Sequence, residues 1–110
     1  MLAAMVMREN TESIELTNRA VIEITTASVR KSRGYSSSCV ILDEIAFFNT
    51  DTEAANPDKE IINALRPSLA TLGGKLVALS SPYARKGALF EAYRMYFGKE
   101  DATRVLVAQA

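Results

Sequence analysis

Residues 39–44 of the sequence are Cys-Val-Ile-Leu-Asp-Glu, a continuous apolar run that ends abruptly in two carboxylates. No polar residue alternates within the run, as is typical of a strand buried on both faces in a parallel sheet. A second, largely apolar run spans residues 75–79 and ends in Ser80-Ser81-Pro82. These two segments indicate a parallel sheet, and such sheets place functional side chains at the carboxyl ends of their strands.

The segments around these two strands have helical spacing. Apolar residues recur every three or four positions over residues 58–72, which predicts an amphipathic helix that Pro67 would kink or divide. We expect a helical turn over residues 45–48, a second helix over 88–97 and a further strand over 103–108. Alternating strands and helices favour an α/β fold with a parallel sheet covered by helices.

The N-terminal part is predicted to form separate elements. Residues 1–8 have the spacing of the last two turns of a helix, and residues 13–17 and 20–26 alternate between apolar and polar side chains. Asn18-Arg19 would join these two alternating segments into a hairpin with one solvated face. Residues 27–38 are rich in serine and basic residues and are predicted to be a loop.

Composition limits the classes of function. A chain of 110 residues is at most one small domain or part of a larger one. Thirteen basic and thirteen acidic residues give zero formal charge, so there is no overall attraction to nucleic acid or to an anionic membrane. The single cysteine and the lack of histidine exclude an internal disulfide and the common Cys/His zinc sites. No apolar stretch approaches the ~18 residues of a membrane span, so we interpret the protein as soluble and intracellular.

The acidic strand end suits nucleotide hydrolysis. Asp43 could hold the water shell of Mg²⁺, a cation that prefers oxygen ligands, while Glu44 orients the attacking water. An alternative is structural, because carboxylates are also favoured where a strand gives way to the N-terminus of a helix. The two serines of Ser80-Ser81-Pro82 could contact the terminal phosphate, although serine and proline are also common in ordinary turns.

Basic residues stand near both strand ends. Arg30, Lys31 and Arg33 precede the acidic strand, and Arg85-Lys86 follow the serines. Arg30, Arg33, Arg85 and Lys86 are candidate contacts to phosphate or to a DNA backbone, the alternative being solvated loop residues. Aromatic residues at helical spacing are predicted to lie in the core, and none is assigned to base stacking: Phe47, Phe48, Phe90, Tyr93, Tyr96 and Phe97.

The sequence contains no Gly-x-x-x-x-Gly-Lys-Ser/Thr motif. The backbone cradle and the lysine that bind the β- and γ-phosphates are therefore missing, so the chain cannot be a self-sufficient P-loop NTPase.

The order of these motifs resembles the middle of the ATPase domain of tailed-bacteriophage terminase large subunits. The resemblance extends from about residue 14 to residue 97. It comprises the hairpin, Arg33-Gly34, a strand ending in Asp43-Glu44 and followed by small and aromatic residues, a helix, and Ser80-Ser81-Pro82. The combination is more specific than any of its parts.

The resemblance implies a partial P-loop NTPase fold of RecA-like type, with an N-terminal β-hairpin and without its Walker A strand. It makes Asp43 the Walker B acid that holds Mg²⁺ through water and Glu44 the catalytic carboxylate that activates water for ATP hydrolysis. Ser80-Ser81-Pro82 would be the coupling motif that senses the γ-phosphate. Arg33 matches the Arg-Gly position of the family, and the match leaves open whether it faces nucleotide, DNA or a neighbouring subunit.

On this interpretation residues 1–110 are a single incomplete domain, with a Walker A segment expected before Met1 and a nuclease domain after Ala110. The isolated piece is not expected to hydrolyse ATP, and its incomplete sheet is expected to self-associate. The parent resembles motors that act in the cytoplasm of the bacterial host, away from membranes. They form a homo-oligomeric ring with portal protein and small terminase subunit and drive double-stranded DNA into a capsid. Two alternatives remain, a piece of a helicase-like ATPase and a non-catalytic α/β interaction module.

Overall fold

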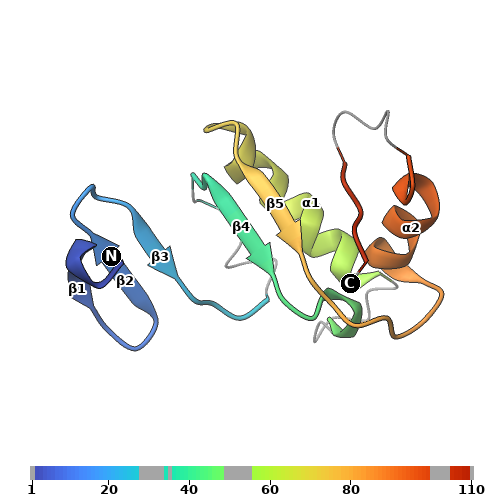
Figure 1. Cartoon of the computed structure of the whole chain (residues 1–110), viewed down its shortest axis with the longest axis horizontal. Helices are drawn as coiled ribbons and strands as arrows, with labels where there is room; N and C mark the ends of the chain where they lie inside the picture. Colours follow the sequence, from blue (N-terminus) through green and yellow to red (C-terminus); the bar gives the residue numbers. More distant parts are fainter. Residues whose placement is uncertain (1, 28–33, 35, 49–55, 100–104, 110) are drawn as a thin grey trace.

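The computed structural model describes residues 2–27, 34, 36–48, 56–99 and 105–109. These residues form a three-stranded antiparallel sheet, a two-stranded parallel sheet and two α-helices, which confirms the predicted α/β class at this level (Figure 1). The predicted loop over 27–38 and the connection over 49–57 lie largely outside the described residues. In chain order the elements are the 3-10 helix η1 (Leu2–Met5), β1 (Val6–Glu9), β2 (Ser13–Leu16), β3 (Val21–Glu23), β4 (Cys39–Leu42), the 3-10 helix η2 (Ile45–Phe47), α1 (Pro57–Ala70), β5 (Lys75–Ala78) and α2 (Gly87–Tyr96).

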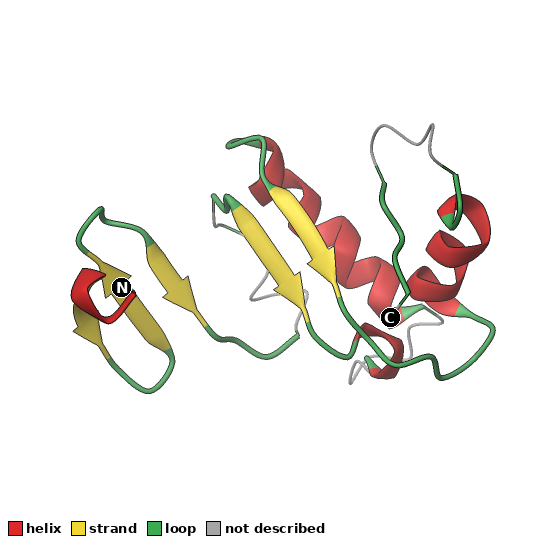
Figure 2. Ribbon diagram, viewed as in Figure 1, coloured by secondary structure: helices red, strands yellow, loops and turns green. Residues whose placement is uncertain are grey.

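The parallel sheet consists of the two strands that were expected from their apolar runs. Strands β4 and β5 pair in parallel, with Cys39 opposite Lys75 and Leu42 opposite Ala78. Helix α1 lies between them in the chain and behind them in space (Figure 2). The predicted order of strand, helix and strand is therefore confirmed over residues 39–78.

Helix α1 supplies much of the core. Its residues Ile61 and Leu65 pack with Leu42 of β4 and Ile45 of η2, and the side chain of Ile61 is only 1% exposed. The helix begins at Pro57, where a missing N–H costs nothing. It continues through Pro67 to Ala70 as one helix, so Pro67 does not divide it and that expectation is wrong.

The expectation that both strands are buried on two faces is also wrong. Val40, Leu42 and Leu76 are at least partly buried, whereas Ile41 is 65% exposed and Val77 is 41% exposed. Ile41 and Val77 are register partners and lie on the same face of the sheet. The helices pack on the opposite face, so an uninterrupted apolar run here marks a strand covered on one side.

The N-terminal sheet contains the predicted hairpin and one strand that was not expected. Strands β2 and β3 pair antiparallel, with Ile14 opposite Ile22. The expectation of one solvated face is wrong for β3, because all three of its residues are exposed. The turn between them includes Arg19 at φ 68°, and Asn18 accepts a hydrogen bond from the Ala20 N–H. The described residues 2–8 do not form the end of a helix, as was expected for 1–8. Leu2–Met5 form a single 3-10 turn and β1 pairs with β2, because two isolated helical turns gain too little against the cost of nucleation.

Helix α2 is largely a surface element. Ala88 and Leu89 pack against the core, but no described residue of the helix is fully buried. Tyr93 and Phe97 stack on one another at 4.6 Å between ring centroids and are more than 40% exposed, as is Phe47, so the prediction that all these aromatics are core residues is wrong.

The strand predicted over residues 103–108 does not form in the part that is described. Residues 105–109 have no strand pairing, and Leu106 is 90% exposed. Residues 103 and 104 lie outside the described ranges. The described helices include none with both the length and the apolar composition to cross a membrane.

Candidate active site

The two polar strand ends lie side by side at one edge of the parallel sheet. The Leu79 N–H donates to the Leu42 carbonyl at 2.9 Å, and the Leu79 carbonyl accepts from the Ile45 N–H at 3.2 Å. In a regular parallel ladder the two bonds of one residue go to partners that are two positions apart. Here they go to positions 42 and 45, so Asp43 and Glu44 occupy the space of one residue. This bulge places both carboxylates outside the ladder, and bulges of this kind re-aim side chains beside active sites.

Glu44 adopts the conformation that makes the bulge. Its backbone is left-handed, at φ 53° and ψ 41°, which costs a non-glycine residue roughly 1–2 kcal/mol. The next residue, Ile45, is 1% exposed and fixes the chain in the core, while Asp43 and Glu44 are both exposed. Strain that is held in place by a buried neighbour and points a carboxylate into solvent is a feature of functional sites.

Ser80 joins the two strand ends through its side chain. Its Oγ accepts a hydrogen bond from the Ala46 N–H at 3.2 Å and donates one to the Ser81 carbonyl at 3.0 Å. The rings of Phe47 and Tyr83 make a second contact between the same segments, at 4.8 Å between centroids. The predicted meeting of the acidic and hydroxyl-bearing strand ends is therefore present in the structure.

The three residues of the hydroxyl cluster are not equivalent. The Ser80 hydroxyl is half-buried and already bonded, so its role in the structure is to hold the strand ends together. Ser81 and Pro82 are exposed. Ser81 is consequently the serine whose hydroxyl is available to contact a ligand at this edge.

Two of the four candidate basic residues lie in the described part of the chain, and no described contact brings them to this edge. Arg85 and Lys86 are exposed and stand further along the loop, immediately before α2. Arg30 and Arg33 lie outside the described residues.

The acids at this edge suit a Mg²⁺ ion that is shared with a substrate. Within the described ranges no three Asp, Glu, Cys or His side chains gather as a metal-binding group. An all-protein cage is therefore not formed by these residues. Mg²⁺ usually keeps several waters and uses one or two carboxylates together with substrate phosphates, and the exposed pair Asp43-Glu44 fits that mode.

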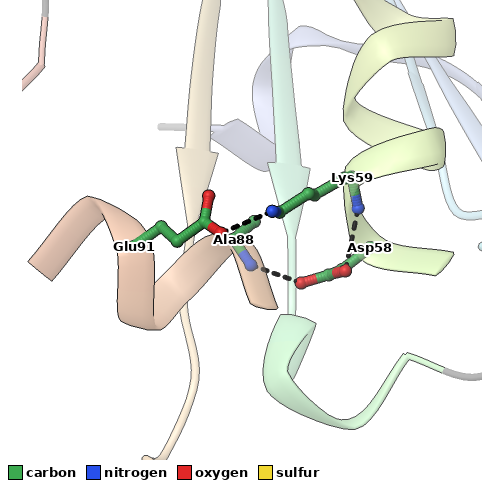
Figure 3. A network of polar contacts seen from close by, with 4 residues as sticks. All are labelled: Asp58, Lys59, Ala88 and Glu91. Atoms are coloured by element: carbon green, nitrogen blue, oxygen red, sulfur yellow. Dashed lines mark hydrogen bonds and ion pairs between the residues drawn. The ribbon is translucent and has the colours of Figure 1, made fainter. Parts of the chain in front are cut away.

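Asp58 is a buried carboxylate that the sequence patterns did not single out. It is 8% exposed, its Oδ1 accepts from the Lys59 N–H at 2.9 Å, and its Oδ2 accepts from the Ala88 N–H at the start of α2 (Figure 3). Lys59 forms an ion pair with Glu91 beside it. An acid in the first turn of a helix is typical of any helix start. Nothing in the local pattern points to a partner thirty residues away.

Comparisons with protein-family models give no match, and comparisons with curated proteins and with solved structures give none of significance.

Proposed function

We propose that the chain carries the Walker B strand and the coupling motif of a motor ATPase of the terminase large subunit type, on a partial P-loop NTPase fold. One observation carries the proposal. The strand end with Asp43-Glu44 and the strand end with Ser80-Ser81 are parallel neighbours, and the Ala46–Ser80 hydrogen bond ties them together. Hydrolysis of a nucleotide needs acids for metal and water beside a group that contacts the terminal phosphate, and this edge offers both.

In this proposal each residue has a separate task. Asp43 would hold the water shell of Mg²⁺, and the Glu44 carboxylate would accept a hydrogen bond from the attacking water and orient it. Mg²⁺, when bound with ATP, would neutralise phosphate charge. Ser81 would contact the γ-phosphate, and Ser80 would hold Ser81 at the correct edge of the sheet. The phosphate-binding loop would come from another segment of the protein.

The proposal extends to the biological setting. The full protein would form a homo-oligomeric ring on a portal protein, bind a small terminase subunit and move double-stranded DNA into a capsid in the bacterial cytoplasm. ATP and Mg²⁺ would be its substrate and cofactor. Arg30, Arg33, Arg85 and Lys86 remain candidates for phosphate or DNA contacts.

The alternative that the two acids merely cap a helix receives little support from the geometry. Glu44 occupies the N-cap position of η2, yet its side chain makes no capping hydrogen bond there. An N-cap side chain stabilises a helix by accepting a backbone N–H, and that acceptor role is missing. Asp43 and Glu44 are also exposed, whereas a purely structural pair would gain most when buried against partners.

The experiment is Mg²⁺-dependent ATP hydrolysis by the full-length protein with Glu44→Gln. We expect turnover to fall by at least about 100-fold while nucleotide binding persists, since removal of a proton-accepting or water-orienting group costs about that much. Glu91→Gln, which removes a half-exposed carboxylate on α2, should leave turnover unchanged. Retained turnover in the Glu44 variant would refute the catalytic assignment, and DNA strand separation without packaging would favour the helicase-like alternative.

A further inference from the structure

The loop between β5 and α2 depends on contacts at its two ends. Residues 80–86, here called the coupling loop, are exposed from Ser81 onward. Apart from the turn and strand bonds at its borders, the described backbone–backbone hydrogen bonds include none made by this loop. A segment with exposed residues and few hydrogen bonds has little local stability, so its position is set by whatever holds its ends.

The first end is held at the candidate active site. The Ser80 hydroxyl binds the Ala46 N–H, and the Tyr83 ring packs on Phe47. Both partners belong to η2, directly after the bulge that carries Glu44. The position of the coupling loop therefore determines which groups stand beside that carboxylate.

The second end is held by Asp58. Its Oδ2 accepts the Ala88 N–H at 2.5 Å, within the first turn of α2, where a negative charge also complements the helix dipole. Gly87 permits this approach, because it has φ +87° and a Cβ added there would lie 2.6 Å from Oδ2. Figure 3 shows the carboxylate between the start of α1 and the start of α2.

The adjacent ion pair is the weaker of the two links. The side chains of Lys59 and Glu91 are 36% and 45% exposed, and exposed pairs contribute only about 0–1 kcal/mol. Asp58 is buried and bonded through both oxygens, so it is the residue that fixes the end of the loop.

We propose that Asp58 is a positioning residue that fixes the coupling loop, so that the junction of α1 and α2 and the carboxyl edge of the parallel sheet act as one mechanical unit. When the bond between Asp58 and the Ala88 N–H is lost, the loop becomes free to move along its length, as far as Tyr83 and Ser80. Loss of the bond between Ser80 and the Ala46 N–H likewise frees the loop as far as Ala88. The link between Asp58 and the loop stands on the contacts alone. Its consequence for nucleotide hydrolysis rests on the proposed function.

Amide hydrogen exchange, followed by mass spectrometry at low micromolar concentration to keep the chain monomeric, tests the link at two reporters, the N–H of Ala46 and the N–H of Ala88. Asp58→Ala should raise exchange at both by about tenfold, a typical coupling between linked sites. Asp58→Asn, which retains one acceptor oxygen, should give a smaller rise at both. Glu91→Gln is the matched control and should change neither.

The reciprocal variant keeps the test decisive if Asp58→Ala fails to fold. Ser80→Ala leaves the α1 core intact and should raise exchange at Ala88 as well as at Ala46, because coupling between two sites is reciprocal. A rise confined to the reporter next to each substitution would overturn the proposal.

Hydrolysis by the full-length protein separates this inference from the proposed function. Asp58→Asn should lower kcat and leave KM for ATP nearly unchanged. The reason is that a loosened loop would hold Ser81 beside the phosphate for only part of the time. If the two reporters respond together but Glu44→Gln leaves turnover intact, the positioning role stands and the proposed function fails. If the reporters do not respond together, the positioning role is refuted whatever the activity.

Discussion

The Ser80 Oγ accepts a hydrogen bond from the Ala46 N–H at 3.2 Å, across strand ends that lie 34 residues apart in the chain. This bond follows directly after the last ladder bonds between β4 and β5, and it continues their pairing with a side chain where the backbones separate. A serine at this position therefore contributes to the fold as well as to the candidate site. The two contributions can be measured separately.

Ser80→Ala should destabilise the protein by about 1 kcal/mol, because it leaves the part-buried Ala46 N–H without its acceptor. Ser81→Ala removes an exposed hydroxyl and should change the free energy of unfolding by less than about 0.5 kcal/mol. Urea unfolding followed by circular dichroism measures both. If the proposed function holds, the ranking should reverse for the turnover of ATP by the full-length protein, with Ser81→Ala the more damaging change. Equal effects of the two variants on stability would contradict the separation of roles.

Of the two variants Glu44→Gly and Glu44→Ala, the glycine variant should be the more stable, which is the reverse of the usual order. At most positions alanine is more stable than glycine, since glycine loses more backbone freedom on folding. At φ 53° the order should invert, and Glu44→Gly should be the more stable variant by roughly 0.5–1 kcal/mol. Arg19 in the hairpin turn, at φ 68°, is the matched control and should show the same inversion.

Activity distinguishes these two left-handed positions. Both Glu44 variants should lack turnover in the full-length protein, whereas Arg19→Gly should retain it. A Glu44→Ala variant more stable than Glu44→Gly in urea would show that the left-handed backbone at this position is not a source of strain.

Strand β4 and the N-terminal hairpin could be predicted because short, continuous stretches of sequence specify them. The apolar run 39–42 with polar residues after it predicts β4 and its end, and alternation with Asn18 predicts the hairpin. The exposure of Ile41 could not be predicted, because an apolar run does not specify how many layers cover it. The bulge at Glu44 also escaped prediction. It results from burial of Ile45 and pairing with Leu79, contacts that sequence spacing does not encode.

Gly87→Ala should cost more in the wild-type background than in Asp58→Ala. The added methyl group meets a backbone at φ +87° in both backgrounds, but it meets the Asp58 Oδ2 only where the carboxylate is present. Contacts of this kind typically couple by 0.5–3 kcal/mol, so a double-mutant cycle should give about 1 kcal/mol. Chemical denaturation of the four proteins supplies the cycle. If the two changes in the free energy of unfolding simply add in the double variant, Gly87 and Asp58 do not interact and the proposed contact is wrong.

Leu42→Ala and Ile41→Ala compare the two faces of one strand at adjacent positions. Leu42 is 7% exposed within the core cluster, so its truncation should cost about 2–5 kcal/mol. Ile41 is 65% exposed, and its truncation should cost less than about 1 kcal/mol, mainly through β-propensity. Thermal unfolding of both variants at low protein concentration provides the comparison. Similar costs would mean that the second face of β4 is also covered in solution.

Self-association of the chain is the expected consequence of that open face. Ile41, Val77 and Leu79 are 65%, 41% and 52% exposed, and the first two are register partners beside strand edges that the described residues leave unpaired. Exposed apolar strands with free edges recruit further strands. The chain should therefore form oligomers at tens of micromolar, the range in which such surfaces associate, as seen by light scattering. Ile41→Lys should shift it toward monomer, because a charge on an open strand opposes pairing, whereas Met7→Lys on the N-terminal sheet, at a residue 50% exposed, should not. A monodisperse wild-type monomer at that concentration would show that this face is stable in water without a partner.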